Sequence, residues 1–362
     1  MTSPGFNKYM TTEEIIHESR KNLAKGPWDY LVGGSESETT MRRNRLAFDK
    51  IAFRPRVLVD VSSIDTSIDL IGKKLRIPVI FAPIGSLQVF NPEGAISVAR
   101  AAAEFEILHV VSSVTQPELE QTAQSTNFAK VFQLYIHGDW DWTKEMIYRV
   151  KKSGYKALCI TVDTANYSRR ERPMLSRWTP VSQRTKRDPK WAASVTWDLV
   201  DKIKEEAGMP LMLKGIATHE DANIAMDHGI EVIWVSNHGG RQLDHGRGTL
   251  DVLPEIMDVV NNRAEVIIDG GIQRGSDVLK AVALGAKGVA LGKLQGWALS
   301  AGGTPALIRL LEIIEDEIRV AMGLIGVTKM SELNQNYVCK EDRVSEPHEM
   351  SSWVNKPIGR IV

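Results

Sequence analysis

A histidine and an arginine three residues apart, His238 and Arg241, are the side chains of this sequence best suited to do chemistry together. They lie in the run Val-Ser-Asn-His-Gly-Gly-Arg-Gln-Leu-Asp at residues 235–244, after an apolar segment. Histidine titrates near neutral pH and can act as general base, whereas arginine stays cationic and binds a carboxylate through two parallel hydrogen bonds. The glycines between them let the backbone approach a flat ligand closely. The run therefore predicts a substrate with a carboxylate and a proton to be removed.

The composition limits the class of protein. The chain has 362 residues, 43% of them hydrophobic, and its 45 basic residues balance 45 acidic ones. A chain of this kind can form one large α/β barrel or two smaller domains with an extensive core. Because the charges balance, no global field attracts nucleic acid or an anionic membrane, and we expect no nucleic-acid partner.

The sequence also predicts a location. No apolar run approaches the roughly 18 residues of a membrane span, and residues 1–10 have no signal-peptide pattern. With only Cys159 and Cys339, a reducing compartment is favoured over secretion. The residues 359–362, Gly-Arg-Ile-Val, do not end in a peroxisomal tripeptide. We expect no membrane span and a cytoplasmic protein.

Short β-rich runs recur along the chain at intervals long enough for a helix between them. They are residues 77–82, 107–112, 130–134, 157–162, 210–213, 232–236, 266–269 and 288–291. The segments between them have helical patterns, for example 93–105 and 277–284. This alternation predicts an α/β fold, a TIM (β/α)8 barrel.

Three segments fall outside the repeat. Residues 1–75 are expected to form an N-terminal helical cap, with a helix starting at Thr11 or Thr12 and a second at 27–32, ended by Gly33 and Gly34. The long fourth loop, 174–195, is a candidate lid. We expect one domain over residues 1–362, with the barrel at 76–338 and a polar tail at 339–362 on the surface or on a neighbouring subunit.

In such a barrel the active site lies at the C-terminal ends of the strands. The residues expected there are Pro83, Ile84, Gly85, Ser112, Gln133, Tyr135, Thr161, Asp163, Lys214, Asn237, His238, Asp269, Gly270, Gly271, Gly292 and Lys293. The glycines after the last two strands, together with Lys293, indicate a phosphate site. Lys214 has two interpretations, because a lysine on a barrel strand could stabilise a negative flavin ring or form a Schiff base, as in an aldolase.

Several candidates have structural alternatives. Tyr30 could be packing in the cap, and Asp163 could cap the following helix. His109, inside an apolar strand, is expected to be a core residue with hydrogen-bond partners. The remaining loop and helix histidines are expected at the surface, at spacings that match no metal site: His137, His219, His228 and His245. We expect no metal.

Residues 30–338 resemble the FMN-dependent 2-hydroxy acid oxidases and dehydrogenases, which include glycolate oxidase, lactate oxidase and mandelate dehydrogenase. The resemblance rests on the run at 236–244 with Gln-Leu-Tyr at 133–135, Thr-Val-Asp-Thr at 161–164, Arg-Arg-Glu at 169–171, Leu-Lys-Gly at 213–215 and Asp-Gly-Gly at 269–271. It implies FMN as cofactor and oxidation of an (S)-2-hydroxy acid to the 2-oxo acid. Dioxygen or another acceptor would then reoxidise the flavin. It also implies a homotetramer.

The resemblance implies a role for each site residue. His238 would remove a proton while two electrons pass from the substrate α-carbon to flavin N5, with Asp163 as its charge partner. The substrate would be bound by Tyr30, Tyr135, Arg170, His238 and Arg241, with both arginines on the carboxylate and Tyr135 on the reacting oxygen. Lys214 would lie near flavin N1 and O2. The cofactor would be held by Pro83, Ile84, Gly85, Ser112, Gln133, Thr161, Lys214, Ser236, Asp269, Gly270, Gly271, Gln273, Arg274, Gly292 and Lys293.

Two departures from the family pattern fall at the FMN phosphate. Gln273 and Lys293 stand where the family has arginines, and Arg274 could compensate from one position along. Because arginine binds phosphate bidentately and lysine acts as a point charge, the pattern predicts a weaker hold on FMN. A binding protein that has lost tight FMN and activity is therefore one alternative function.

Other departures fall in the substrate pocket. Val114 stands where glycolate oxidase has a tryptophan, and Tyr167 replaces a smaller aliphatic residue. The same FMN scaffold acting on a larger or atypical metabolite is therefore a second alternative. Gly85 occupies a small-residue position that the oxidases often fill with alanine and some dehydrogenases with glycine. The electron acceptor thus stays open.

Overall fold

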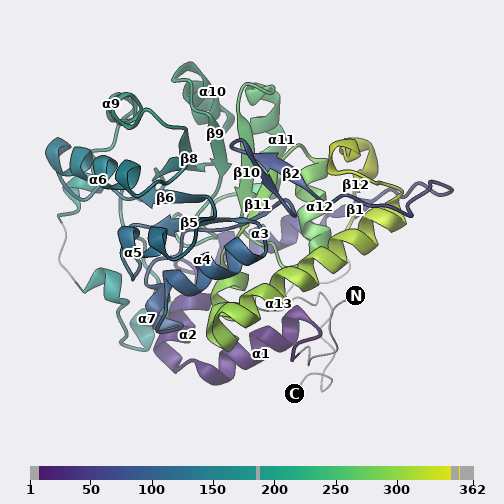
Figure 1. Cartoon of the computed structure of the whole chain (residues 1–362), viewed down its shortest axis with the longest axis horizontal. Helices are drawn as coiled ribbons and strands as arrows, with labels where there is room; N and C mark the ends of the chain where they lie inside the picture. The colour runs from purple at the N-terminus through teal and green to yellow at the C-terminus, as the bar shows by residue number, and fades with distance from the viewer. Residues whose placement is uncertain (1–7, 185–187, 344–349, 351–362) are drawn as a thin grey trace.

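In the computed structural model, which describes residues 8–184, 188–343 and 350, parallel strands form a closed barrel surrounded by helices (Figure 1). The barrel strands are β4 Val79–Phe81, β5 Leu108–Ser112, β6 Lys130–Leu134, β7 Ala157–Thr161, β8 Leu211–Ile216, β9 Val232–Val235, β10 Glu265–Asp269 and β11 Gly288–Leu291. β11 pairs with β4 and closes the barrel. The predicted TIM barrel is confirmed.

The strands are apolar throughout because both of their faces are buried. Alternate residues such as Val110, Val131 and Met212 form the barrel interior, and the residues between them pack against the helices. One layer further toward the C-terminal ends, the interior becomes polar. That layer holds Ser112, Gln133, Thr161, Lys214 and Asp269, all buried.

Helices follow the strands and cover the outside of the barrel. They are α4 Ala95–Glu104, α5 Leu119–Gln124, α6 Trp140–Lys152, α9 Trp197–Ala207, α10 His219–Asp227, α11 Thr249–Val260, α12 Gly275–Ala283 and α13 Lys293–Ile325. α13 is broken at Gly302 and Gly303, whose backbone is not helical. The helices predicted at 93–105 and 277–284 are confirmed within two residues as α4 and α12.

The N-terminal cap contains more structure than the sequence predicted. α1 Thr12–Asn22 starts at a capping box of Thr11 and Glu14, and α2 Lys25–Val32 ends at Gly33, as expected. The sequence missed α3 Thr39–Asp49 and the hairpin of β2 Ile68–Leu70 and β3 Lys73–Leu75. Leu70 and Leu75 of the hairpin belong to the cluster of the barrel interior, so the hairpin seals one end of the barrel.

The fifth barrel strand is longer than predicted. It was expected at 210–213, but β8 continues to Ile216, with a register shift between Lys214 and Ile216 in its pairing with β9. The strand tolerates the charge of Lys214 because the ammonium is buried against a hydroxyl and a carboxylate of neighbouring strands. Tertiary pairing therefore extends a strand that local composition would end.

The tail and the fourth loop also contain regular structure. β1 Ile51–Phe53 pairs antiparallel with β12 Val338–Lys340, so the first tail residues form a strand, and most of the segment 344–362 lies outside the described residues. The fourth loop holds α7 Glu171–Leu175, η2 Val181–Gln183 and α8 Lys190–Ala193. The other 3-10 helices are η1 Leu87–Val89, η3 Met330–Glu332 and η4 Gln335–Tyr337.

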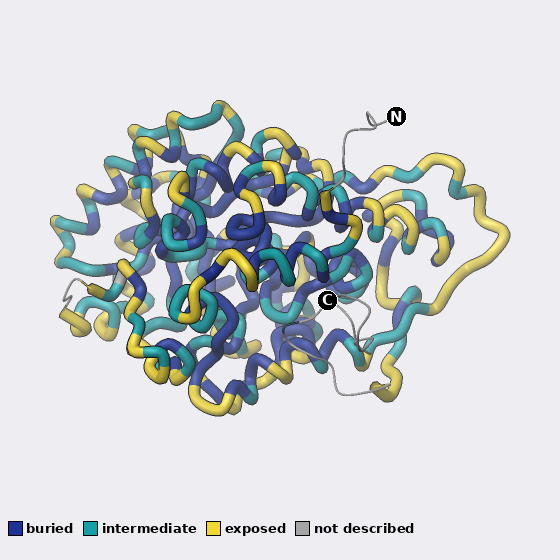
Figure 2. The backbone as a smooth tube through the Cα atoms, turned by 90° about the horizontal axis from the view of Figure 1, so that it is seen from below, coloured by how far each residue is buried: buried dark blue, intermediate teal, exposed yellow. Residues whose placement is uncertain are grey.

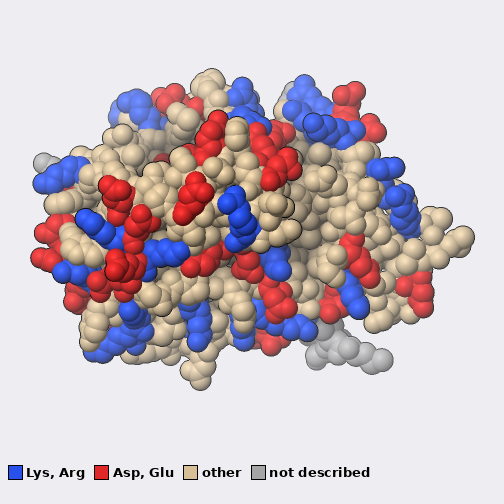
Figure 3. Space-filling model, turned by 90° about the horizontal axis from the view of Figure 1, so that it is seen from above, with Lys and Arg blue, Asp and Glu red and all other residues tan. Residues whose placement is uncertain are grey.

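Basic and acidic residues are equal in number in the sequence, with 45 of each. Basic and acidic side chains are interspersed over the face shown in Figure 3. Burial is concentrated in the barrel and under its helices, whereas the arm that contains Val57, Leu58 and Val59 projects from one side and is exposed (Figure 2). Within the described ranges, no helix combines the length and apolarity needed to cross a membrane. Nor do the described residues contain a group of three or more His, Cys, Asp or Glu placed to hold a metal ion.

Candidate active site

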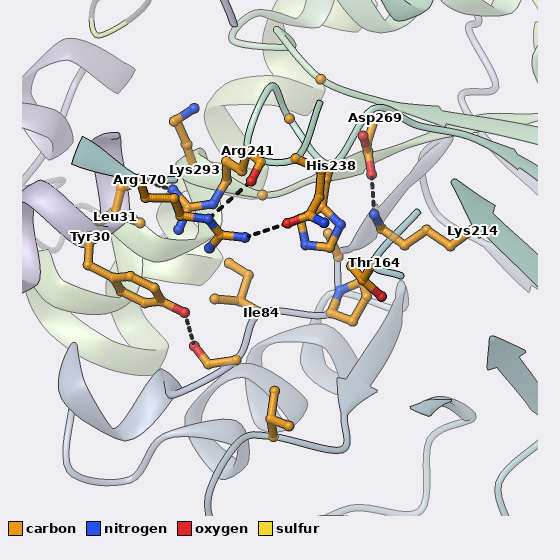
Figure 4. A pocket seen from close by; sticks show the side chains of 18 of the residues that line it. Tyr30, Leu31, Ile84, Thr164, Arg170, Lys214, His238, Arg241, Asp269 and Lys293 are labelled. Atoms are coloured by element: carbon orange, nitrogen blue, oxygen red, sulfur yellow. Dashed lines mark hydrogen bonds and ion pairs between the residues drawn. The ribbon is translucent and has the colours of Figure 1, made fainter. Parts of the chain in front are cut away.

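A cavity of about 580 Å³ lies at the C-terminal ends of the barrel strands (Figure 4). Its size is that of a site for a cofactor and a small ligand. Most of the site residues predicted from the sequence line it: Tyr30, Pro83, Ile84, Gly85, Tyr135, Arg170, Lys214, His238, Arg241, Asp269, Gly270, Gly271, Gln273, Gly292 and Lys293. The fold thus brings together residues from the cap, the strand ends and the fourth loop.

His238 and Asp163 form a hydrogen-bonded pair at one wall of the cavity. Nδ1 of His238 lies 2.9 Å from Oδ1 of Asp163, and both side chains are largely buried. Burial would raise the pKa of Asp163, but the charges of His238 and Lys214 outweigh it and hold that pKa below its ordinary value. Because an ionised carboxylate can only accept, we assign the imidazole proton to Nδ1. Nε2 is then left to accept a proton.

The electrostatics of this wall favour the neutral imidazole. Burial lowers the pKa of His238 below 6.5, and Lys214 and Arg170 add to the effect, while Asp163 opposes it. At neutral pH His238 is therefore unprotonated and able to act as a base.

Two arginines from different loops meet beside this pair. Nε of Arg170 donates to the backbone oxygen of Arg241 at 3.1 Å, and Nη1 of Arg241 donates to the carbonyl of Gly33 at 2.6 Å. The guanidinium of Arg241 lies over the ring of Tyr30, at 5.1 Å from the centroid. Burial and the neighbouring charge of Arg170 lower the pKa of Arg241 to about 10. Two confined like charges create a site for an anion.

Lys214 stays charged at the floor of the cavity. Its Nζ donates to Oγ of Ser236 at 2.9 Å and lies 3.4 Å from Oδ2 of Asp269. Burial would lower the pKa of Lys214, but Asp269 and Asp163 outweigh it and raise that pKa. A Schiff base needs a neutral amine, so the geometry favours the electrostatic interpretation of Lys214 over the aldolase one.

The phosphate site that the sequence predicts is a glycine-lined recess at the start of α13. Gly270 and Gly271 have φ of +95° and +85°, a region that favours glycine, and a Cβ on Gly271 would lie 2.6 Å from the carbonyl oxygen of Asn44. Gly292 faces open space, and Lys293 follows it as the first residue of the helix. Helix N-termini of this kind bind phosphate groups.

Arg274 does not line this recess. Its guanidinium is directed to Glu317, with Nη2 3.1 Å from Oε1, and the residue is absent from the cavity wall. The expectation that Arg274 would compensate for Gln273 is therefore not supported by the geometry. Gln273 does line the cavity, and its backbone N–H donates to Asp277 at 2.9 Å.

A comparison with protein families matches residues 19–340 to the FMN-dependent dehydrogenases. The chain belongs to this family. It is 34% identical to a peroxisomal (S)-2-hydroxyacid oxidase of Arabidopsis thaliana over 93% of this chain and 98% of that protein. Against an L-lactate oxidase of a Nostoc species the identity is 35%, over 88% and 95%. A solved mandelate oxidase superposes with a TM-score of 0.86 at 34% identity, covering 93% and 100%.

As an FMN-dependent dehydrogenase, the protein is an oxidoreductase with FMN as cofactor, and its buried polar groups fit that cofactor. Nε2 of Gln133 and Oγ1 of Thr161 are buried and have no hydrogen-bond partner among the described residues. Both lie in the same barrel layer as Lys214. Buried donors need partners, and the polar edge of a flavin ring would supply them.

Four residues that were expected to contact the cofactor of this dehydrogenase lie just below the cavity wall: Ser112, Gln133, Thr161 and Ser236. Ser112 donates to Oε1 of Gln133 at 2.9 Å, and Thr161 is buried beside them. Ser236 donates to Asp269 and accepts from the backbone N–H of His238 at 3.0 Å. These four residues form the floor on which Lys214, Asp269 and His238 are held.

Sequence reasoning missed the three cavity residues on α3, of which Asn44 and Arg45 are polar and the third is Met41. Nη1 of Arg45 donates to the carbonyl of Gly271 at 2.6 Å and to Asp277 at 2.7 Å. With Met41 and Phe48 they occupy buried positions spaced as one helix face. Polar residues on an otherwise apolar face were the signal that could have found them.

Two histidines differ from expectation. His137, predicted at the surface, is half-buried, stacks on Tyr135 with ring centroids 5.9 Å apart and lines the cavity, because its strand ends at the rim. His109 is buried as predicted, but neither ring nitrogen has a hydrogen-bond partner in the described part of the chain. Burial lowers the pKa of His109 to about 3, since apolar side chains surround it and the charge of Lys130 lies nearby.

Proposed function

We propose that this FMN-dependent dehydrogenase oxidises an (S)-2-hydroxy acid to the 2-oxo acid, with His238 as the base. The observation that carries the proposal is the pairing of a neutral imidazole with Asp163 in the same cavity as Arg170 and Arg241. A base and two cations in one site suit a substrate with a carboxylate next to the carbon that is oxidised. The names of the relatives, which act on 2-hydroxy acids and lactate, support the same class.

The arginines bind and orient the substrate. Arg170 and Arg241 hold its carboxylate, and the hydroxyl of Tyr30, which donates to the carbonyl of Gly85 at 3.4 Å, lies at the same wall. Burial raises the pKa of Tyr135, so its phenol stays protonated and can donate a hydrogen bond to the reacting oxygen.

His238 then takes the proton at Nε2. Asp163 stabilises the imidazolium that forms, because their hydrogen bond becomes a charge-assisted one. The substrate loses two hydrogens in all, one from the α-carbon and one from its hydroxyl: His238 takes one as a proton, and FMN, when bound, would take up the other together with the two electrons. Lys214 keeps its positive charge at the floor of the cavity, where it offsets negative charge on a bound ring.

Three further properties belong to the proposal. Dioxygen is the favoured electron acceptor, since the relatives are named oxidases. A homotetramer is the expected assembly, and the exposed apolar residues Val57, Leu58 and Val59 are candidates for its interface. The two free cysteines, Cys159 and Cys339, are in keeping with a cytoplasmic location. Sedimentation of the holoenzyme and cell fractionation test the last two.

The test is anaerobic mixing of the holoenzyme with glycolate, lactate, mandelate and long-chain 2-hydroxy acids, followed by oxygen. We expect one of them to bleach the flavin and oxygen to restore its colour. His238→Ala should bind FMN and stay yellow with the same substrate. Bleaching of that variant at the parent rate would remove His238 as the base, and no bleaching of the parent by any hydroxy acid would overturn the proposed reaction.

A substrate with a larger side chain is a second candidate, favoured by one observation. The cavity continues past Val114 to His137 and to the fourth-loop residues Gln183 and Ala192. A cavity that extends beyond the arginines has room for more than a hydrogen or a methyl group on the α-carbon. In the same panel, faster bleaching by mandelate or a long-chain acid than by glycolate would support this candidate.

A further inference from the structure

The catalytic histidine is held in an unfavourable backbone conformation. His238 has φ of +60°, in the left-handed region that residues with a side chain seldom adopt, and Gly239 and Gly240 follow with φ of +66° and +74°. Such a conformation is strained and persists only where surrounding contacts impose it. The turn at 237–240, here called the base turn, therefore needs an anchor.

The anchor of the base turn is the side chain of Asn237. Its Oδ1 accepts from the backbone N–H of Gly240 at 3.0 Å, which closes the turn around His238. The same Oδ1 accepts from Nδ2 of Asn44 at 2.9 Å, and Nδ2 of Asn237 donates to Oδ1 of Asn44 at 2.7 Å. The two amides thus form a reciprocal pair, and this pair fixes how Asn237 is oriented together with the carbonyl of Arg247, which accepts from Nδ2 of Asn237 at 2.9 Å.

Asn44 is itself rigidly placed on α3. It is 1% exposed, and its Oδ1 also accepts from the backbone N–H of Thr249 at 3.1 Å, at the start of α11. The N-terminus of α3 is tied to the far end of the same loop, because Oδ1 of Asp244 accepts from the backbone N–H of Thr40 at 2.8 Å. α3 therefore holds the segment 237–244 at both of its ends.

We propose that Asn44 is a positioning residue for His238, since its amide pair with Asn237 holds the base turn and so aims the imidazole at Asp163. The inference rests on the proposed function, because it assumes that His238 is the base. Asn44 acts through Asn237, and it supports proton removal without taking a proton itself.

The rest of the site has separate anchors, so the effect of Asn44 should be selective. Arg241 is held by the carbonyls of Leu31 and Gly33, and Nε2 of Gln242 donates to the carbonyl of Asp163 at 3.0 Å. The glycine recess keeps the contact of Arg45 with Gly271 and the packing of Gly271 on the backbone carbonyl of Asn44, although the Asn44 amide also lies against Gly270, where a Cβ would come within 3.0 Å of Nδ2. Loss of the Asn44 amide should therefore slow the chemical step while leaving substrate and FMN binding nearly intact.

The test compares Asn44→Ala and Asn44→Asp with the holoenzyme. Asn44→Asp keeps the size and the acceptor for Thr249, but it replaces the donor to Asn237 by a second acceptor. We expect anaerobic flavin reduction at saturating substrate to fall about 10- to 100-fold in both, as for the loss of one or two buried hydrogen bonds to the turn. Three dissociation constants should stay within about threefold of the parent values. They are the apparent Kd of the hydroxy acid, the Kd of FMN and the Kd of oxalate, a carboxylate that cannot be oxidised by loss of an α-hydrogen.

Arg43→Ala is the matched control. Nη1 of Arg43 joins the same helix to the same loop, at the carbonyls of His245 and Gly246, but it is exposed and lies beyond the base turn. The flavin of Arg43→Ala should be reduced at the same rate as that of the parent.

Three outcomes would overturn the inference. In the first, flavin reduction in the Asn44 variants is as fast as in the parent. In the second, Arg43→Ala slows flavin reduction as much as the Asn44 variants do. In the third, the rate falls only in proportion to FMN release or to weaker oxalate binding. If neither Asn44 variant folds, Asn44 is a structural residue of the cap and the inference is equally lost. A parent flavin that no hydroxy acid reduces would instead count against the proposed function, so the two failures are distinguishable.

Discussion

Nδ1 of His238 lies 2.9 Å from Oδ1 of Asp163, although 75 residues separate them along the chain. The strand ends of β7 and β9 bring them together, and Gly215 on β8 makes room for the carboxylate, since a Cβ there would lie 2.7 Å from that of Asp163. The contact sets both the tautomer and the charge of the base. It is therefore the relationship most open to a test by pH.

Asp163→Asn should slow flavin reduction about 10²- to 10⁴-fold, the range seen when a carboxylate that orients a catalytic histidine is removed. In the parent, the rate should fall as the pH drops through the pKa of His238, because only the neutral imidazole is a base; burial holds that pKa below 6.5. Asp163 raises that pKa, so its removal should move the remaining acid limb to lower pH. Stopped-flow reduction across pH measures both effects.

A matched control for this variant exists on the surface. Asp201 lies 2.7 Å from Nδ1 of His228, outside the cavity. Asp201→Asn should leave the rate and its pH profile unchanged. An unshifted acid limb in Asp163→Asn would mean that the limb does not report His238.

Gly85 and Val114 should behave as one unit. A Cβ on Gly85 would lie 2.8 Å from Cγ2 of Val114, closer than such atoms come. Gly85→Ala should therefore raise the KM of the preferred hydroxy acid about tenfold, and Val114→Ala should reverse most of that loss in the double variant. The coupling free energy should be about 1 kcal/mol, within the range for residues in contact. Additive effects in the double-mutant cycle would show that the two sites are independent.

The limits of sequence reasoning are clear from particular residues. The barrel strands and the strand-end residues follow from local patterns, because apolar runs and the glycine, histidine and lysine after them are close together in sequence. The direction of Arg274 does not follow, since it depends on Glu317, which reaches it from α13. Asn44 and Arg45 were missed because their partners, Asn237 and Gly271, lie in distant loops.

The two arginines should control anion binding. Arg241→Gln removes one of two confined charges, so kcat/KM should fall about 100-fold or more, as for the loss of charge-assisted hydrogen bonds to a carboxylate. Oxalate, a carboxylate that cannot be oxidised by loss of an α-hydrogen, should raise the unfolding temperature of the parent but much less that of Arg241→Gln. Differential scanning fluorimetry with added oxalate measures the shift.

The control for the arginine variant is Arg169→Gln. Arg169 neighbours Arg170, but it is exposed and its guanidinium forms a long ion pair with Glu171, at 3.9 Å. It should keep both the parent kcat/KM and the oxalate shift. If oxalate raised the unfolding temperature of the parent and of Arg241→Gln equally, its carboxylate would bind elsewhere than at Arg241.

Lys293 should carry the charge recognition of the FMN phosphate, because Arg274 is turned to Glu317 and Arg45 is shared between Asp277 and Asp49. Lys293→Met should weaken FMN about tenfold or more, whereas riboflavin, which lacks the phosphate, should bind with nearly unchanged affinity. Lys293→Arg should tighten FMN, since a guanidinium can bind phosphate bidentately. Titration of the apoprotein by flavin fluorescence gives both constants. Arg274→Met is the control and should change neither; if it weakens FMN as much as Lys293→Met does, its guanidinium reaches the phosphate after all.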